Sequence, residues 1–117
     1  MFLFGRERGF LMTVGASAEL AKRCPGKRLE NWAEMLKNGD DVETIENRAA
    51  LICILNKGYE DNKHYSDPDY EMEPLTMGQV LSLTNSEFLK LLSEALEATQ
   101  PKREIESVPL KKNTAKA

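Results

Sequence analysis

Hydrophobic residues recur every three or four positions along most of this chain, which is the spacing of helices with one buried face. This pattern predicts helices over the following ranges: 13–23, 28–38, 42–58, 76–81 and about 85–99. Polar residues suited to helix capping stand at the expected starts: Thr13 or Ser17, Asp40 or Asp41, Thr76, and one of Thr84, Asn85 and Ser86. The chain therefore reads as a mainly α protein, a small helical bundle.

The segment 42–58 has the broadest hydrophobic surface. Its apolar stripe is widened by further apolar neighbours, which together comprise Val42, Ile45, Ala49, Leu51, Ile52, Cys53, Ile54 and Leu55. Apolar residues on several sides predict a central, well-buried helix that ends at Gly58 or Tyr59. Residues 60–74 are rich in acidic side chains and include Pro68 and Pro74, so we predict a solvated loop there.

The N-terminal residues show a different pattern. Two apolar runs, at 2–4 and 10–14, flank a charged stretch that Gly5 and Gly9 bracket. This order predicts a β-hairpin whose strands are the two apolar runs. Because an isolated hairpin is only marginally stable in water, this one must pack on the helices or pair with another chain.

Length and charge set the domain organisation. With 117 residues, the chain has room for one domain, which we place at residues 1–100. Residues 101–117 are polar, carry five basic and two acidic side chains, and are predicted to form a disordered basic tail. The net charge of -3 does not favour nucleic-acid binding, because that relies on clustered Lys and Arg.

Hydropathy and cysteine content indicate a cytoplasmic protein. The longest apolar stretch, residues 49–55, is much shorter than a membrane-spanning helix, and the N-terminal apolar run is too short for a signal peptide. Cys24 and Cys53 each lie in an apolar helical pattern, so we expect reduced thiols in the core.

No residue pattern points to catalysis. His64 is the single histidine and lies among acidic residues, where a metal-binding or acid–base role is the alternative to a solvated side chain. The acidic stretch lacks the glycine and the spacing of a calcium-binding loop, and Pro68 interrupts it. Phosphate-binding and nucleophile motifs are also absent from the sequence. We therefore expect no enzymatic activity, no cofactor and no metal.

Two features suggest a protein partner instead. The late helices carry closely spaced apolar residues that could dock an amphipathic helix, although any one of them could simply belong to the core. The basic tail could reach an acidic partner, or it could serve only to keep the chain soluble. The candidate partner-binding residues are Val80, Leu81, Phe88, Leu91, Leu92, Lys111 and Lys112.

The order of these elements resembles a known family. Residues 2–13 (FLFGRERGFLMT) run directly into the helical segment VGASAEL, a central helix follows, and PLTMGQV then precedes another helix and a polar tail. Over about residues 2–100 this layout resembles the tail assembly chaperones of long-tailed bacteriophages and prophages. In that family an acidic residue often follows the Leu-Thr pair, where this chain has Gly78 and Gln79.

The resemblance implies a function. Such chaperones bind the elongated, helical tape-measure protein and keep it soluble while the tail assembles, in the cytoplasm of the bacterial host. It implies no cofactor, makes self-association into oligomers plausible, and carries over no binding residue.

A small regulatory or DNA-binding protein is the alternative. Segments 28–38 and 42–58 could form a helix-turn-helix. The second helix would then begin Val42-Glu43-Thr44-Ile45-Glu46, with acidic residues where DNA phosphates would lie, which counts against this alternative.

Overall fold

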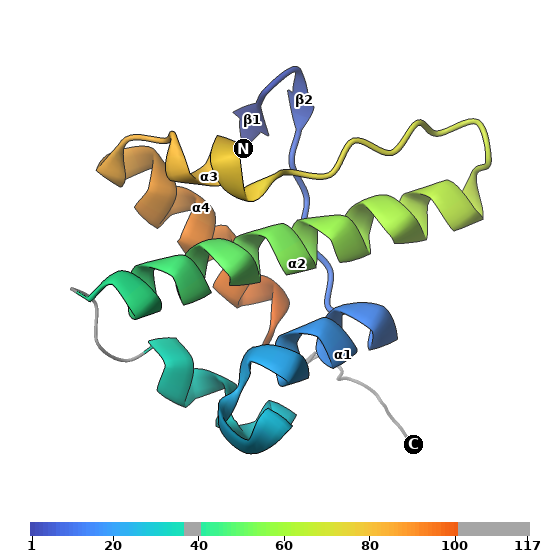
Figure 1. Cartoon of the computed structure of the whole chain (residues 1–117). Coiled ribbons are helices and arrows are strands. Elements are labelled where there is room, and N and C mark those ends of the chain that lie inside the picture. Colours follow the sequence, from blue (N-terminus) through green and yellow to red (C-terminus); the bar gives the residue numbers. More distant parts are fainter. Residues whose placement is uncertain (37–40, 101–117) are drawn as a thin grey trace, which may run out of the picture.

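A computed structural model describes residues 1–36 and 41–100, and this part of the chain is mainly helical (Figure 1). The elements are β1 (Phe2–Leu3), β2 (Arg6–Glu7), α1 (Val14–Arg23), the 3₁₀ helices η1 (Pro25–Lys27) and η2 (Leu29–Leu36), α2 (Val42–Ser66), α3 (Met77–Leu81) and α4 (Asn85–Ala98). The predicted fold class, a helical protein with an N-terminal hairpin, is confirmed. The predicted disordered tail lies outside the described residues.

The long helix α2 is the centre of the fold. It packs against α1, η2, α3 and α4, and Figure 1 shows it running across the middle of the molecule between them. Its middle part supplies Leu51, Ile52 and Leu55 to the core, all fully buried. Leu20 of α1 and Leu91 of α4 pack in the same cluster. The prediction of a central buried helix is thus confirmed, and its face toward α3 and α4 positions the candidate site.

The end of α2 differs from the prediction. The helix continues to Ser66, so the predicted loop over residues 60–74 was wrong for its first part. The acidic residues there do not all face solvent: Glu60 is fully buried and hydrogen-bonded, and Asp61 forms an ion pair with Lys57 one turn earlier, at 2.8 Å. The helix ends immediately before Asp67-Pro68, because proline disfavours helical backbone at the residue before it.

The hairpin exists, but its second strand was predicted at the wrong place. β1 pairs antiparallel with Arg6–Glu7, and the turn between them places Phe4 and Gly5 at positive φ angles of 52° and 92°. The apolar run 10–14 instead crosses α2, where the Leu11 amide donates to the Leu55 carbonyl at 3.0 Å. Phe10 and Met12 pack against the core, which explains why this run is apolar without being a strand.

The second predicted helix is a 3₁₀ helix in its described part, Leu29–Leu36; residues 37–40 lie outside the description. Trp32 and Met35, three positions apart, both face the core. A repeat of three residues per turn places such a pair on one side, so the apolar spacing that indicates an α-helix also fits this tighter helix.

Four predicted caps are confirmed. The side chains of Thr13, Asp41, Thr76 and Thr84 each accept a hydrogen bond from the backbone N–H three residues later. At Thr76 and Thr84 the side chain of the third residue also accepts from the cap backbone, which completes a capping box. These caps fix where α3 and α4 begin and hence the geometry of the connection between them.

We expect Thr84→Ala to lower the free energy of unfolding by about 1 kcal/mol, because it removes the acceptor for the Glu87 amide at the start of α4. Urea unfolding of the full chain measures this. Ser86→Ala is the matched control, since Ser86 is exposed on the same turn. Equal losses in both variants would contradict the assignment of the cap to Thr84.

Candidate functional site

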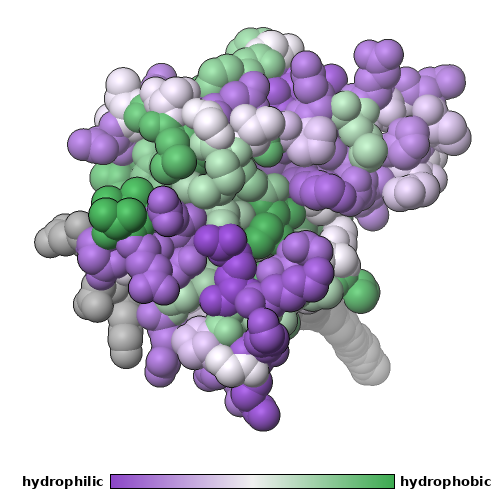
Figure 2. Space-filling model, in the orientation of Figure 1, coloured by the Kyte–Doolittle hydropathy of each residue, from purple (hydrophilic) through white to green (hydrophobic). Residues whose placement is uncertain are grey.

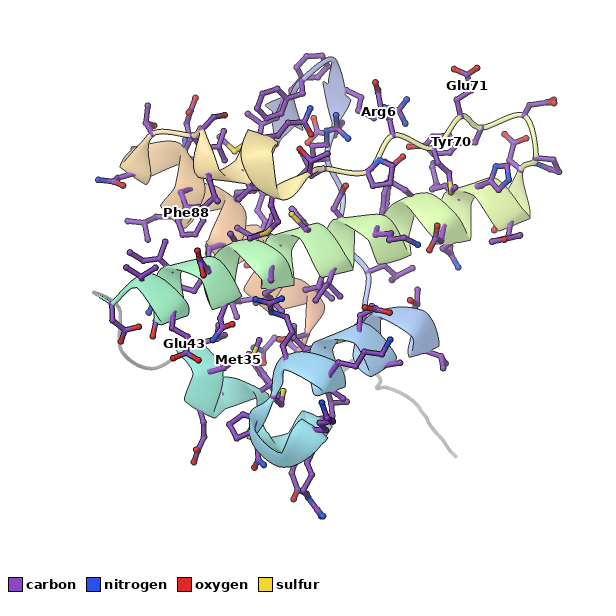
Figure 3. All side chains as sticks on the ribbon, in the orientation of Figure 1. Arg6, Met35, Glu43, Tyr70, Glu71 and Phe88 are labelled. Atoms are coloured by element: carbon purple, nitrogen blue, oxygen red, sulfur yellow. The ribbon has the colours of Figure 1, made fainter. Side chains whose placement is uncertain are left out.

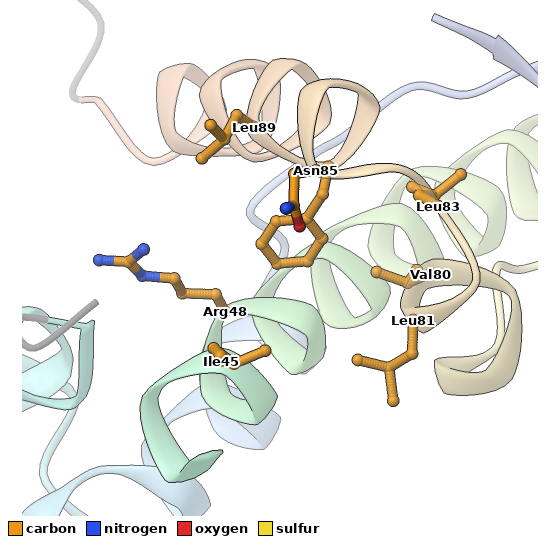
Figure 4. A pocket seen from close by; sticks show the side chains of 8 residues that line it. Ile45, Arg48, Val80, Leu81, Leu83, Asn85 and Leu89 are labelled. Carbon is orange, nitrogen blue, oxygen red and sulfur yellow. The ribbon is translucent and has the colours of Figure 1, made fainter. Parts of the chain in front are cut away.

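An apolar groove of about 390 Å³ lies where the N-terminal half of α2 meets α3 and the start of α4. In Figure 4, Ile45 and Arg48 of α2 face Asn85 and Leu89 of α4 across it. The α3 side is closed by apolar residues, and Phe88 of α4, labelled in Figure 3, completes the lining. The lining residues are Ile45, Arg48, Val80, Leu81, Leu83, Asn85, Phe88 and Leu89.

Several of these side chains are exposed to a degree unusual for large aliphatic residues. Leu89 is 57% exposed, Leu81 49% and Ile45 40%. Val42, one turn before Ile45 on α2, is also exposed and extends the apolar surface. Figure 2 shows hydrophobic residues gathered over this end of the molecule. A continuous apolar surface of this kind commonly marks an interaction site.

Arg48 is the single charged side chain among the described residues that line the groove. Its Nη2 donates to the Leu36 carbonyl at 2.9 Å, which ties it to the end of η2. A guanidinium has five N–H donors, so this bond leaves capacity for an acceptor. The groove therefore combines apolar walls with one positive charge, and it suits an apolar ligand that carries an acidic group.

The predicted partner-binding residues divide into three groups. Val80, Leu81 and Phe88 line the groove together. Leu91 and Leu92 instead lie in the core, where they are 0% and 7% exposed. Lys111 and Lys112 fall outside the described residues.

Sequence reasoning missed the groove's contributions from Ile45, Arg48, Asn85 and Leu89. For Leu89 the signal was weak, because it stands beside the apolar face of α4 rather than on it. Ile45 belongs to the apolar stripe of α2, and it is exposed because it faces the open groove, whereas its neighbours Thr44 and Asn47 are buried.

A second group of polar residues is buried at the other half of α2. The Glu60 carboxylate is fully buried and accepts from Arg6 Nη1 at 3.0 Å, the Tyr70 hydroxyl at 2.9 Å and the Glu73 backbone N–H at 2.8 Å. Arg6 also donates to the Glu71 carbonyl at 2.8 Å, and Figure 3 shows Arg6, Tyr70 and Glu71 close together. Burial and the bond to Glu60 raise the pKa of the Tyr70 hydroxyl.

Two further buried side chains strengthen the same connection. Arg8, 2% exposed, donates to the carbonyls of Leu3, Phe4 and Glu73. Asn56, one turn before Glu60 on α2, donates to the Gly9 carbonyl at 3.0 Å and accepts from the Leu75 N–H at 2.8 Å. The hydrogen bonds of Glu60, Arg8 and Asn56 are made to backbone and side-chain groups of the chain itself. This network holds the hairpin and residues 67–76 on α2, which is a structural role.

His64 and the cysteines lie apart from one another. His64 is in the last turn of α2, half-buried, with Nδ1 3.0 Å from the Tyr70 carbonyl. Cys24 and Cys53 are free thiols, as expected, and burial raises the pKa of Cys53 to about 11. A thiol with so high a pKa is a poor nucleophile near neutral pH.

Within residues 1–36 and 41–100, no cluster of three or more His, Cys, Asp or Glu side chains is arranged to hold a metal ion. None of the described helices is both long and apolar enough to cross a membrane. No protein-family model, curated protein or solved structure shows significant similarity to this chain.

Proposed function

We propose that this protein binds an amphipathic helical segment of another protein in the groove between α2, α3 and α4. The observation that carries the proposal is the groove itself, whose large aliphatic side chains stay exposed while their neighbours Val80 and Leu91 are buried. An amphipathic helix presents apolar residues at every third or fourth position, which can fill such a groove. An acidic residue on the same helix would meet Arg48.

The client we propose is an elongated helical protein, the tape-measure protein of a long-tailed phage or prophage. In this role the chain is a tail assembly chaperone that covers apolar helical surfaces without catalysis, acts in the host cytoplasm and self-associates into oligomers. The groove supports the proposal because a chaperone for a long helical client needs an apolar site that accepts many similar segments. Co-expression with the tape-measure protein tests it: the client should become more soluble and form a complex.

DNA binding remains the weaker proposal. The N-cap Asp41 and the first turns of α2, which a helix-turn-helix would insert into the DNA groove, carry the exposed carboxylates of Asp41, Glu43 and Glu46, and DNA phosphates repel them. Most of α2 beyond these turns is covered by α1, α3 and α4. A salt-sensitive gel shift with specific DNA would reverse this ranking.

We expect Leu81→Asp and Leu89→Asp each to weaken binding of a groove ligand by at least about tenfold, because each places a charge on the apolar wall. The probe is a synthetic amphipathic helical peptide with leucines at helical spacing and one glutamate, and fluorescence anisotropy measures its binding. Val14→Asp is the control, because Val14 is 89% exposed on α1 and does not line the groove. Equal affinity in all variants would contradict docking in the groove.

A further inference from the structure

The chain itself contains a segment suited to the groove. We propose that residues 104–110, Glu-Ile-Glu-Ser-Val-Pro-Leu, bind in the groove between α2, α3 and α4 as an intramolecular ligand that competes with the client. These residues lie outside the described part of the structure. The inference rests on where α4 ends, how far the following residues reach, and how their chemistry matches that of the groove.

The reach of the segment is sufficient. α4 ends at Ala98, and Leu89 in the groove wall is nine residues earlier, which corresponds to roughly 14 Å along a helix. An extended chain spans about 3.3 Å per residue, so the five to eight residues after Gln100 cover roughly 16 to 26 Å. Residues 105–110 can therefore return along α4 to the groove without any change in the described fold.

The large aliphatic residues of the segment distinguish it from the rest of the tail. The large aliphatic residues of 101–117 are Ile105, Val108 and Leu110, and all three fall within this segment. Residues 101–103 and 111–117 contain none. Val108 and Leu110 are two apart and flank Pro109, which favours extended backbone at the residue before it, so their side chains would lie on the same side of an extended chain and enter the groove together.

The charges also match. Glu104 and Glu106 flank Ile105, and the groove lining carries the positive charge of Arg48. With Val108 and Leu110 in the groove, these glutamates can meet Arg48.

The consequence is regulation of the client site, and this part of the inference rests on the proposed function. A tethered ligand has an effective concentration in the millimolar range, so even a weak intrinsic affinity keeps the groove mostly covered. A client must displace the segment. The client's apparent affinity is therefore its intrinsic affinity multiplied by the fraction of molecules in which the groove is open.

The first test measures where the segment lies, independently of any client. In full-length protein with Cys53→Ala, Val108→Cys is combined either with Leu89→Cys, in the groove wall, or with Lys90→Cys, the next residue on α4, which does not line the groove. Under mild oxidation we expect the pair with Leu89→Cys to form an intramolecular disulfide at least about fivefold faster. Equal rates, or disulfides that join two chains, would overturn the proposal.

The second test measures competition. We expect Val108→Asp with Leu110→Asp, in the full chain, to tighten binding of the amphipathic peptide about threefold to tenfold, whereas Thr114→Asp leaves it unchanged. Equal affinity in both variants would overturn the regulatory role. If the peptide binds neither variant, the proposed function is refuted. The disulfide rates then still test whether the segment docks in the groove.

Discussion

Glu60→Ala is expected to lower the free energy of unfolding by about 3 kcal/mol, because it removes a fully buried, paired carboxylate. The substitution removes the acceptor shared by Arg6, Tyr70 and the Glu73 N–H. Arg6 is 24% exposed and keeps its bond to the Glu71 carbonyl, so it is partly compensated, but the Tyr70 hydroxyl and the Glu73 N–H lose their acceptor. Urea unfolding followed by circular dichroism measures the loss.

Glu71→Ala is the matched control. Glu71 is adjacent to Tyr70 and exposed, and it takes part in the network through its backbone carbonyl, which alanine retains. Its loss should stay within about 0.5 kcal/mol. Glu60→Gln should fall between the two, since an amide keeps one acceptor oxygen but loses the charge that favours Arg6. Similar losses for Glu60→Ala and Glu71→Ala would show that the buried carboxylate does not hold the hairpin.

The Glu60→Ala variant also tests whether the two halves of α2 have separate roles. Glu60 is fifteen residues beyond Ile45 on the same helix, roughly 22 Å from the groove. Under conditions where Glu60→Ala is still folded, it should therefore bind the amphipathic peptide with unchanged affinity. A loss of both stability and binding would mean that the groove depends on the hairpin end of the fold.

Local chemistry explains which parts of the fold the sequence predicts. Caps such as Thr76 and Thr84 act on backbone groups within three residues, so the sequence alone identifies them. The apolar face of α4 is equally local, because Phe88, Leu91, Leu92, Ala95 and Leu96 repeat at helical spacing, and all five pack in or against the core.

Contacts between distant residues explain the errors. Glu60 reads as a loop residue because it stands in an acidic run, and its partner Arg6 is 54 positions away in the sequence. The second strand of the hairpin and the residue after it are charged rather than apolar, because Arg6 binds Glu60 of α2 and Arg8 binds the Glu73 carbonyl. Propensity and periodicity do not contain these pairings, so the burial of Glu60 could not be predicted from the residues around it, whereas the end of α2 before Pro68 follows from a local signal.

For the groove, too, the sequence identifies some of the residues correctly and others wrongly. Val80, Leu81 and Phe88 were selected because they are apolar and near in sequence, but the same argument selected Leu91 and Leu92, which the core covers. Whether an apolar residue of α4 faces the core or the groove depends on how the helix is rotated against α2. That rotation depends on how α4 packs against α2, which is distant in sequence, so the hydrophobic pattern identifies the helix but not its open side.

Gly58→Ala is expected to destabilise the protein by about 2 kcal/mol, although alanine is the better helix former. A Cβ at this position in α2 would lie 2.5 Å from the Leu11 carbonyl oxygen and 3.1 Å from Thr13 Oγ1. The nearest obstacle is backbone, and it belongs to the segment whose Leu11 N–H bonds the Leu55 carbonyl, so the N-terminal segment and the start of α1 would have to move away from α2. A lower urea midpoint with an unchanged slope would report this loss.

Gly15→Ala is the same chemical change, but it is expected to raise the free energy of unfolding. A Cβ on Gly15, in the first turn of α1, would meet only Thr13 Oγ1, at an ordinary 3.9 Å. The variant should therefore gain the helical preference of alanine, about 0.5 kcal/mol, without a clash. If Gly58→Ala were also stabilising, the close approach of residues 11–13 to α2 would be wrong. Opposite signs would establish that glycine is required at position 58 because the N-terminal segment crosses α2 there, so this crossing fixes α1 against the central helix.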